Sequence, residues 1–177
     1  GGIAYQNLKE TKPLLRYQYG KKYEEVSIKK RKYNPSKYFF TANFLIKASV
    51  FHQVKFEEKL TEYGREDLLF SIQLKQKGYA VTHLDNPVFH LGIDSDAVFI
   101  EKTKKAVENL LYLQHANFLV PKDVTLLKLG QFLERLGLAS FIGQRFYFFN
   151  EKLIKSPSIF LFNCMRVSYY LSLKMKV

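Results

Sequence analysis

Tyr63-Gly64-Arg65-Glu66-Asp67-Leu68-Leu69-Phe70 is the run that decides the expected fold of the first half of this chain. A glycine-bearing turn gives way to a helix, which is predicted over residues 66–77 and closed by Gly78 at the usual C′ position. Two adjacent carboxylates fall in its first turn, where the positive end of the helix dipole favours their ionised form. Such a carboxylate at a cleft edge can accept a proton from an attacking hydroxyl, so Glu66 and Asp67 are candidate catalytic residues. Acids at a helix start also occur without any chemistry.

A second candidate lies downstream of this helix. Residues 79–84 are predicted to form a strand, Asn86-Pro87 interrupts it, and residues 88–91 resume extended structure and carry His90. A neutral imidazole can bind a metal through a ring nitrogen, which makes His90 a candidate metal ligand. A partly buried strand histidine with a structural role explains the same residue. The remaining histidines are interpreted as structural: His52, His83 and His115.

The segment before the run mixes short elements of both kinds. Residues 3–6 are predicted to form a short strand and residues 12–26 a helix, and Lys29-Lys30-Arg31-Lys32 is a basic run. Such a run grips phosphates in some proteins and is more often a solvated loop. Residues 38–46 are aromatic and apolar, which predicts a buried strand, and residues 47–54 are predicted to form a short helix.

From residue 94 the pattern becomes helical throughout. Asp96 is a suitable N-cap for the first helix, Gly137 ends the second, and Ser156-Pro157 is a start signal for the last. Four helices are predicted here, over residues 97–118, 121–136, 138–155 and 157–174. The sequence therefore predicts an α/β part over residues 1–93 and a helical extension over residues 94–177.

The charge of the chain indicates an anionic partner. The net charge is +12, and nucleic acid, an anionic membrane surface and a phosphorylated sugar donor all fit that charge. Residues 1–47 hold eleven Lys and Arg against three Asp and Glu, and residues 138–177 hold six against one. Because the basic residues are split between the two ends and no recognised binding motif accompanies them, the pattern argues against nucleic acid.

The basic C-terminal segment is also rich in aromatic residues. Residues 138–177 contain nine Phe and Tyr side chains. This composition is typical of a helix that lies in a membrane interface. It is equally typical of a helix whose rings pack on a protein core while Lys and Arg face water. No stretch of about 20 residues lacks charge, so no membrane-spanning helix is expected.

The single cysteine and the first residues bear on location and completeness. Cys164 cannot form an internal disulfide, which fits a reducing compartment, and its apolar surroundings predict a buried inert thiol. The chain opens on Gly1-Gly2-Ile3 without Met or a signal peptide pattern. We therefore expect a piece of a longer, cytoplasmic protein.

Residues 40–90 contain several further short motifs in a fixed order. They are Phe40-Thr41-Ala42-Asn43-Phe44-Leu45-Ile46-Lys47, Ser49-Val50-Phe51, Phe56-Glu57-Glu58, Tyr63-Gly64-Arg65-Glu66-Asp67-Leu68, Leu74-Lys75, Gly78-Tyr79, Asn86-Pro87-Val88 and His90. In this order they resemble the C-terminal half of family 2 glycosyltransferases, inverting enzymes of the GT-A fold. The matching features are a strand that leads to a basic residue, an "F-D-E" element, a "G-x-E-D" acceptor-site motif and a closing strand with a histidine. The resemblance covers about a third of the chain.

The resemblance implies both a fold and an activity. It implies that residues 1–93 form an incomplete, acceptor-side half of a GT-A (nucleotide-diphospho-sugar transferase-like) α/β domain, followed by the helical extension 94–177. It implies transfer of a sugar, with inversion, from a nucleotide-sugar donor to a hydroxyl of a glycan or lipid-linked acceptor, as in bacterial polysaccharide biosynthesis. The expected location is then the cytoplasm, with peripheral contact of residues 138–177 at the inner face of the membrane. The alternative is a basic membrane-surface or nucleic-acid binding module without catalysis.

The resemblance also assigns roles to individual residues. Asp67 is expected to be the general base, and Glu66 to orient the acceptor or the base. His90 is expected to complete the shell of a metal or to contact the diphosphate. Expected acceptor-binding residues are Asn43, Tyr63 and Gly64.

The resemblance further implies a divalent metal, Mg²⁺ or Mn²⁺, in the full-length enzyme. In this family an Asp-x-Asp element holds that metal on the donor diphosphate. Asp94-Ser95-Asp96 matches the Asp-x-Asp pattern, but it follows His90 and opens a helix, so we interpret it as a helix cap. The donor-binding half is therefore expected upstream of Gly1, and the chain is expected to be inactive alone.

Overall fold

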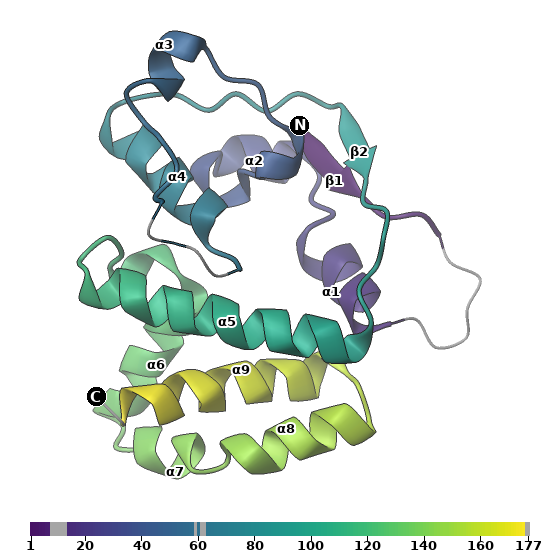
Figure 1. Ribbon diagram of the computed structural model, residues 1–177, viewed down its shortest axis with the longest axis vertical. Helices are drawn as coiled ribbons and strands as arrows, with labels where there is room; N and C mark the ends of the chain where they lie inside the picture. Colours follow the sequence, from purple (N-terminus) through teal and green to yellow (C-terminus); the bar gives the residue numbers. More distant parts are fainter. Residues whose placement is uncertain (8–13, 59, 61–62, 176–177) are drawn as a thin grey trace. The chain divides into compact units, whose positions relative to one another are not determined.

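The structure, a computed structural model, describes residues 1–7, 14–58, 60 and 63–175 (Figure 1). The chain divides into two compact units. The first comprises Gly1–Thr61 and Arg65–Asp94, and the second comprises Glu62–Gly64 and Ser95–Val177.

The first unit is built from short helices and one pair of strands. Its elements in chain order are β1 (Gly2–Ala4), α1 (Leu15–Tyr23), α2 (Ile28–Tyr33), the 3₁₀ turns η1 (Ser36–Tyr38) and η2 (Thr41–Asn43), α3 (Ala48–Phe51), α4 (Glu66–Gln76) and β2 (Pro87–Phe89). The strands β1 and β2 are parallel, with Gly2 opposite Pro87 and Ala4 opposite Phe89. This register places the residues that follow both strands at the same end of the pair.

The prediction of an α/β half-domain is wrong for this chain. Of the described residues, 61% are helical and only 4% lie in strands, in two strands of three residues each, so this part of the chain is mostly helical. Of the strands predicted from the sequence, only those around residues 3–6 and 88–91 have a counterpart, in β1 and β2. Residues 38–46 comprise the last residue of η1, the turn η2 and irregular backbone, and residues 79–84 have no regular structure.

The two failed strand predictions have a common physical reason. An apolar run predicts that side chains are buried, whereas a strand also needs a neighbour for its backbone hydrogen bonds. Phe39 and Phe44 have extended backbone angles, but the turn η2 lies between them. Their rings, with the side chains of Tyr79 and Val81, pack on Val54, Phe70 and Leu74. Apolar side chains of both runs are thus partly buried, mainly against the helix α4, without a sheet.

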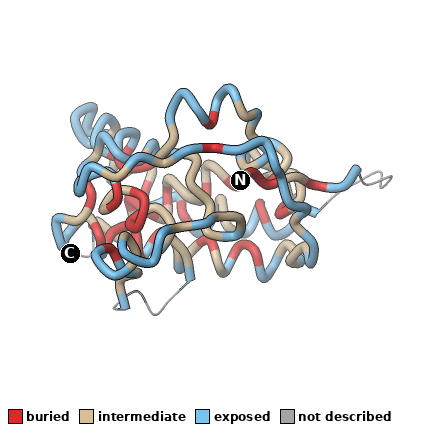
Figure 2. Tube along the Cα trace, turned by 90° about the horizontal axis from the view of Figure 1, so that it is seen from above, coloured by how far each residue is buried: buried red, intermediate tan, exposed pale blue. Residues whose placement is uncertain are grey.

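The second unit is entirely helical in its described residues. Its elements are α5 (Asp96–His115), the 3₁₀ turn η3 (Pro121–Asp123), α6 (Thr125–Arg135), α7 (Ala139–Gly143), α8 (Phe146–Lys155) and α9 (Ile159–Lys174). The helix α9 packs against α5, α6, α7 and α8 and is central to the unit (Figure 1). Buried positions recur along these helices between exposed ones (Figure 2). None of the described helices combines the length and the apolar run that crossing a bilayer requires.

The cap of the helix after residue 94 and the basic run Lys29–Lys32 differ from the sequence expectations. The helix predicted over residues 97–118 is capped by Ser95, whose hydroxyl accepts from the N–H of Val98, and not by Asp96. The basic run Lys29–Lys32 lies in α2 and is not a wholly solvated loop. Arg31 from this run is buried and donates to the carbonyls of Val26 and Leu84. Lys12 and Pro13, at the predicted start of the first helix, lie outside the described residues.

Candidate functional site

A group of polar side chains lies where β1 and β2 end, and we call it the polar cluster: Tyr5, Arg16, Glu24 and His90. The parallel register brings Tyr5 and His90 side by side, and the N–H of His90 continues the pairing by donating to the carbonyl of Ala4 at 2.9 Å. Their rings stack with centroids 5.3 Å apart and planes 11° apart. The strand pair therefore fixes the position of the imidazole.

The helix α1 contributes the charged half of the polar cluster. Arg16 and Glu24 are a little over two helical turns apart, so both face the same side. Arg16 is only 6% exposed, and its Nη2 lies 2.9 Å from Oε2 of Glu24. The hydroxyl of Tyr5 donates to the same carboxylate oxygen. Burial raises the pKa of Tyr5, and the hydrogen bond to Glu24 raises it further, so this phenol stays protonated.

The hydrogen bonds of His90 decide what its imidazole can do. Nη2 of Arg16 lies 3.1 Å from Nε2 of His90. A guanidinium only donates, so this contact assigns Nε2 as the acceptor and the ring proton to Nδ1. Nδ1 is buried and makes no hydrogen bond within the described part of the chain. The imidazole therefore presents a donor at Nδ1.

The metal expected from the resemblance does not fit this arrangement. A cation at Nε2 of His90 would face the positive guanidinium of Arg16 at hydrogen-bond distance. The described residues also contain no group of three His, Cys, Asp or Glu side chains that could hold a metal ion. An N–H donor beside a guanidinium suits an anionic oxygen instead. Of the two roles expected for His90, the geometry favours contact with a diphosphate.

Asp67 lies in the first turn of α4, as the sequence predicted. The turn before it has two consecutive left-handed residues, Gly64 with φ 94° and Arg65 with φ 82°. Burial raises the pKa of the Asp67 carboxyl and the negative charge of Glu66 raises it further, while the N–H of Leu68, at 2.7 Å from Oδ1, lowers it. The net shift is upward, so burial outweighs the helix dipole that was expected to dominate.

Electrostatics link Asp67 to the polar cluster. The charge of Glu24 makes a smaller contribution to the raised pKa of Asp67, so the two carboxylates lie within range of a Coulomb interaction. Glu24 in turn contacts Arg16, and Arg16 contacts His90. Neither of the two described cavities is lined by Asp67 or by His90.

Replacing Asp67 by asparagine is expected to stabilise the fold at neutral pH. Because the pKa of Asp67 is raised on folding, ionising it opposes folding at every pH above its folded pKa. We expect a gain of about 0.5–2 kcal/mol at pH 7, the usual size of a single stabilising substitution. The gain should shrink as pH falls through the folded pKa and vanish below the ordinary value of 3.8. Urea unfolding of both forms across this range measures it, and a pH-independent difference would contradict the assignment.

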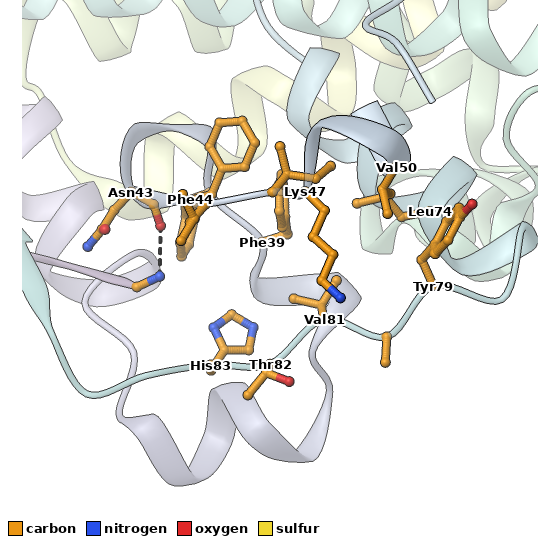
Figure 3. A pocket seen from close by; sticks show the side chains of 15 residues that line it. Phe39, Asn43, Phe44, Lys47, Val50, Leu74, Tyr79, Val81, Thr82 and His83 are labelled. Carbon is orange, nitrogen blue, oxygen red and sulfur yellow. Dashed lines mark hydrogen bonds between the residues drawn. The ribbon is translucent and has the colours of Figure 1, made fainter. Parts of the chain in front are cut away.

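Asn43 lines a cavity of about 460 Å³ in the first unit (Figure 3). The lining is mainly aromatic and aliphatic, and the Lys47 side chain extends along it (Figure 3). The amide of Asn43 donates to the carbonyls of Gly2 and Asn86 at 3.0 and 2.9 Å. Asn43 therefore ties β1 to the segment before β2, and its polar groups serve the fold.

Tyr63 and Gly64 belong to the second unit and not to the unit that contains Asp67. Asn109 of α5 donates to both of their carbonyls, at 3.3 and 3.0 Å. A Cβ on Gly64 would lie 2.8 Å from Cβ of Ala106, so only glycine fits there. The half-exposed ring of Tyr63 lines a second cavity, of about 450 Å³, beside Lys102. The structure does not join these two residues with Asp67 in one described cavity.

Sequence reasoning missed three members of the polar cluster. Tyr5, Arg16 and Glu24 were assigned no role, although an Arg and a Glu eight residues apart in a predicted helix fall on one face. That spacing was the available signal. What connects them to His90 is the strand register, which no local pattern reveals.

Comparison with known proteins identifies no family for this chain. No protein-family model matches the chain, and neither a curated protein nor a solved structure matches it.

Proposed function

We propose that this chain supplies the acceptor side of an inverting glycosyltransferase, with Asp67 as the general base. The observation that carries the proposal is the raised pKa of the Asp67 carboxyl, beside Glu66 and within electrostatic range of the polar cluster. An ordinary aspartate is a weak base at neutral pH, and a carboxylate with a raised pKa is a stronger one. The ordered motifs between residues 40 and 90 supply the reaction class.

The proposed reaction is a single in-line displacement. The acceptor hydroxyl oxygen forms a bond to the anomeric carbon of the nucleotide-sugar as the bond to the diphosphate oxygen breaks on the opposite face. The hydroxyl proton passes to the carboxylate of Asp67, and the electron pair of the broken bond leaves with the nucleoside diphosphate. The configuration at the anomeric carbon is inverted.

His90 and Glu66 support this step in different ways. The Nδ1 atom of His90 is buried without a described hydrogen-bond partner, so its N–H can donate to a diphosphate oxygen only where that oxygen enters the polar cluster. The exposed carboxylate of Glu66 raises the pKa of its neighbour and can accept a hydrogen bond from the acceptor. No described residue of this chain is assigned to binding the rest of the donor.

The proposal is tested by a transfer assay on the full-length polypeptide. Nucleotide-sugars of different bases and sugars are offered with and without a mixture of glycan and lipid-linked acceptors, and release of the nucleoside diphosphate is measured. We expect release from one donor that depends on an acceptor. Release that does not depend on any acceptor, or none from any donor, would contradict the proposal.

A further inference from the structure

The second unit presents an exposed face along α7 and α8 that alternates aromatic and basic residues. We call it the aromatic–basic face: Phe141, Arg145, Phe148, Lys152 and Lys155. Only Gln144 and Arg145 separate the two helices, and the N–H of Phe149 donates to the carbonyl of Arg145, so the helical path is nearly continuous. Spacings of three and four residues then place all five side chains on one side of it.

The opposite side of α7 and α8 is already occupied. Gly143, Phe146 and Leu153 are buried, and both helices pack on α9. A Cβ on Gly143 would lie 3.1 Å from the backbone of Leu171 and Ser172, which shows how closely α7 approaches α9. The aromatic–basic face is therefore the side that points away from the core of this unit.

The apolar part of this face is large for a water-facing surface. Phe141 is 58% exposed and Phe148 is 52% exposed, and the adjacent Tyr147 and Ile154 are 72% and 60% exposed. Tyr147 and Ile154 lie on another side of the helical path, because neighbours in sequence are about 100° apart around a helix. The face itself therefore carries two exposed aromatic rings, Phe141 and Phe148, among three basic side chains, and this combination indicates an interaction surface.

Cations lie over the exposed rings. The guanidinium carbon of Arg145 is 4.6 Å from the ring centroid of Phe141, and Nζ of Lys152 is 5.8 Å from that of Phe148. Such pairs gain strength when water is removed while the charge keeps a polar partner. The occupant of this face must therefore accept rings and satisfy positive charges within a few ångströms of one another.

We propose that the aromatic–basic face docks on the surface of an anionic lipid bilayer. Aromatic and aliphatic side chains enter the boundary between headgroups and acyl chains, and Lys and Arg side chains extend to the lipid phosphates. The charge balance of residues 138–177, six basic against one acidic, complements such a surface. An apolar protein groove would bury the three cations without partners. Both helices would lie in the membrane plane, which requires no spanning segment.

A tryptophan probe tests this directly, because the chain contains no Trp. Phe148→Trp places the probe on the face, and Leu45→Trp places it at an exposed site in the first unit. Vesicles of phosphatidylcholine with about 30% phosphatidylserine are compared with vesicles of phosphatidylcholine alone. We expect the emission of Phe148→Trp to shift to the blue only with the anionic vesicles and to return as salt is added. Equal shifts at both probe sites, or none at Phe148→Trp, would overturn the proposal.

Co-sedimentation with the same anionic vesicles separates the apolar and the charged contributions. Phe141→Ser with Phe148→Ser should lower the partition coefficient about tenfold or more, since two rings no longer enter the interface. Lys152→Glu with Lys155→Glu should lower it by at least about tenfold. The control Lys55→Glu with Lys75→Glu changes the net charge equally at exposed sites of the first unit and should have a much smaller effect. Equal losses in the two charge-reversal variants would contradict docking through this face.

A second copy of the chain is the competing occupant. Sedimentation velocity without lipid distinguishes a dimer from a monomer. If the native chain is a dimer and the double variant Phe141→Ser with Phe148→Ser is a monomer, this face is a protein contact and the proposal is overturned. Thermal melts show whether each variant remains folded. Substitutions at these exposed positions should leave the melting temperature nearly unchanged.

Discussion

Replacing Asp67 by asparagine in the full-length polypeptide is expected to lower the rate of glycosyl transfer by about 10²–10⁴-fold. Asparagine keeps the shape of the side chain and can still accept the hydrogen bond from the N–H of Leu68. It cannot take a proton from the acceptor hydroxyl. The loss is therefore expected in kcat, with little change in KM for the donor.

Two control variants show whether this loss belongs to Asp67. Glu151→Gln removes an exposed carboxylate outside the ordered motifs and should leave the transfer rate unchanged. Glu66→Gln removes the neighbouring charge that helps to raise the pKa of Asp67, so a smaller loss is expected. Unchanged transfer by Asp67→Asn, measured on protein with a normal melting curve, would remove Asp67 from the mechanism.

Replacing Glu24 by alanine is expected to destabilise the chain by about 3–5 kcal/mol. The carboxylate of Glu24 faces the buried guanidinium of Arg16 at 2.9 Å and also accepts from the hydroxyl of Tyr5. Burial alone would lower the pKa of Arg16, and the attraction of Glu24 raises it above its usual value. Removing Glu24 therefore leaves a buried positive charge opposite an alanine. Urea unfolding at neutral pH measures the change.

A double variant and an exposed pair serve as controls for Glu24. Arg16→Met with Glu24→Leu replaces both charges by apolar side chains, and buried ion pairs exchanged in this way often cost little. We expect the double variant to recover most of the stability lost by Glu24→Ala. Glu101→Gln, which breaks the exposed ion pair with Lys104, should cost at most about 1 kcal/mol. A Glu24→Ala variant as stable as Glu101→Gln would contradict the energetic account of the polar cluster.

Helices were predictable from this sequence because their signals are local. The 3.6-residue period, Gly78 after α4 and Ser156-Pro157 before α9 all act within one or two turns, although the residue that caps α9 is Ser158. The α/β expectation failed because strand pairing depends on distant partners. The apolar residues 38–46 and 79–84 pack on Phe70 and Leu74 in the first unit without forming a ladder. Their sequence predicts burial in either case.

The features of the candidate site also divide into local ones, which the sequence predicts, and tertiary ones, which it does not. The position of Asp67 in the first turn of a helix followed from the residues around it. Its raised pKa did not, because burial and the charge of Glu24 come from the tertiary structure. The environment of His90 was equally hidden, since the parallel pairing of β1 with β2 brings it to Tyr5 and Arg16.

The pH dependence of transfer is the most direct test of Asp67 as the proton acceptor. The full-length polypeptide should show kcat/KM for the acceptor rising with pH on the acid side, as the base loses its proton. Its inflection should lie above the usual range for an aspartate, and Asp67→Asn should abolish that limb in the residual activity. An acid limb that persists unchanged in Asp67→Asn would show that another group takes the proton.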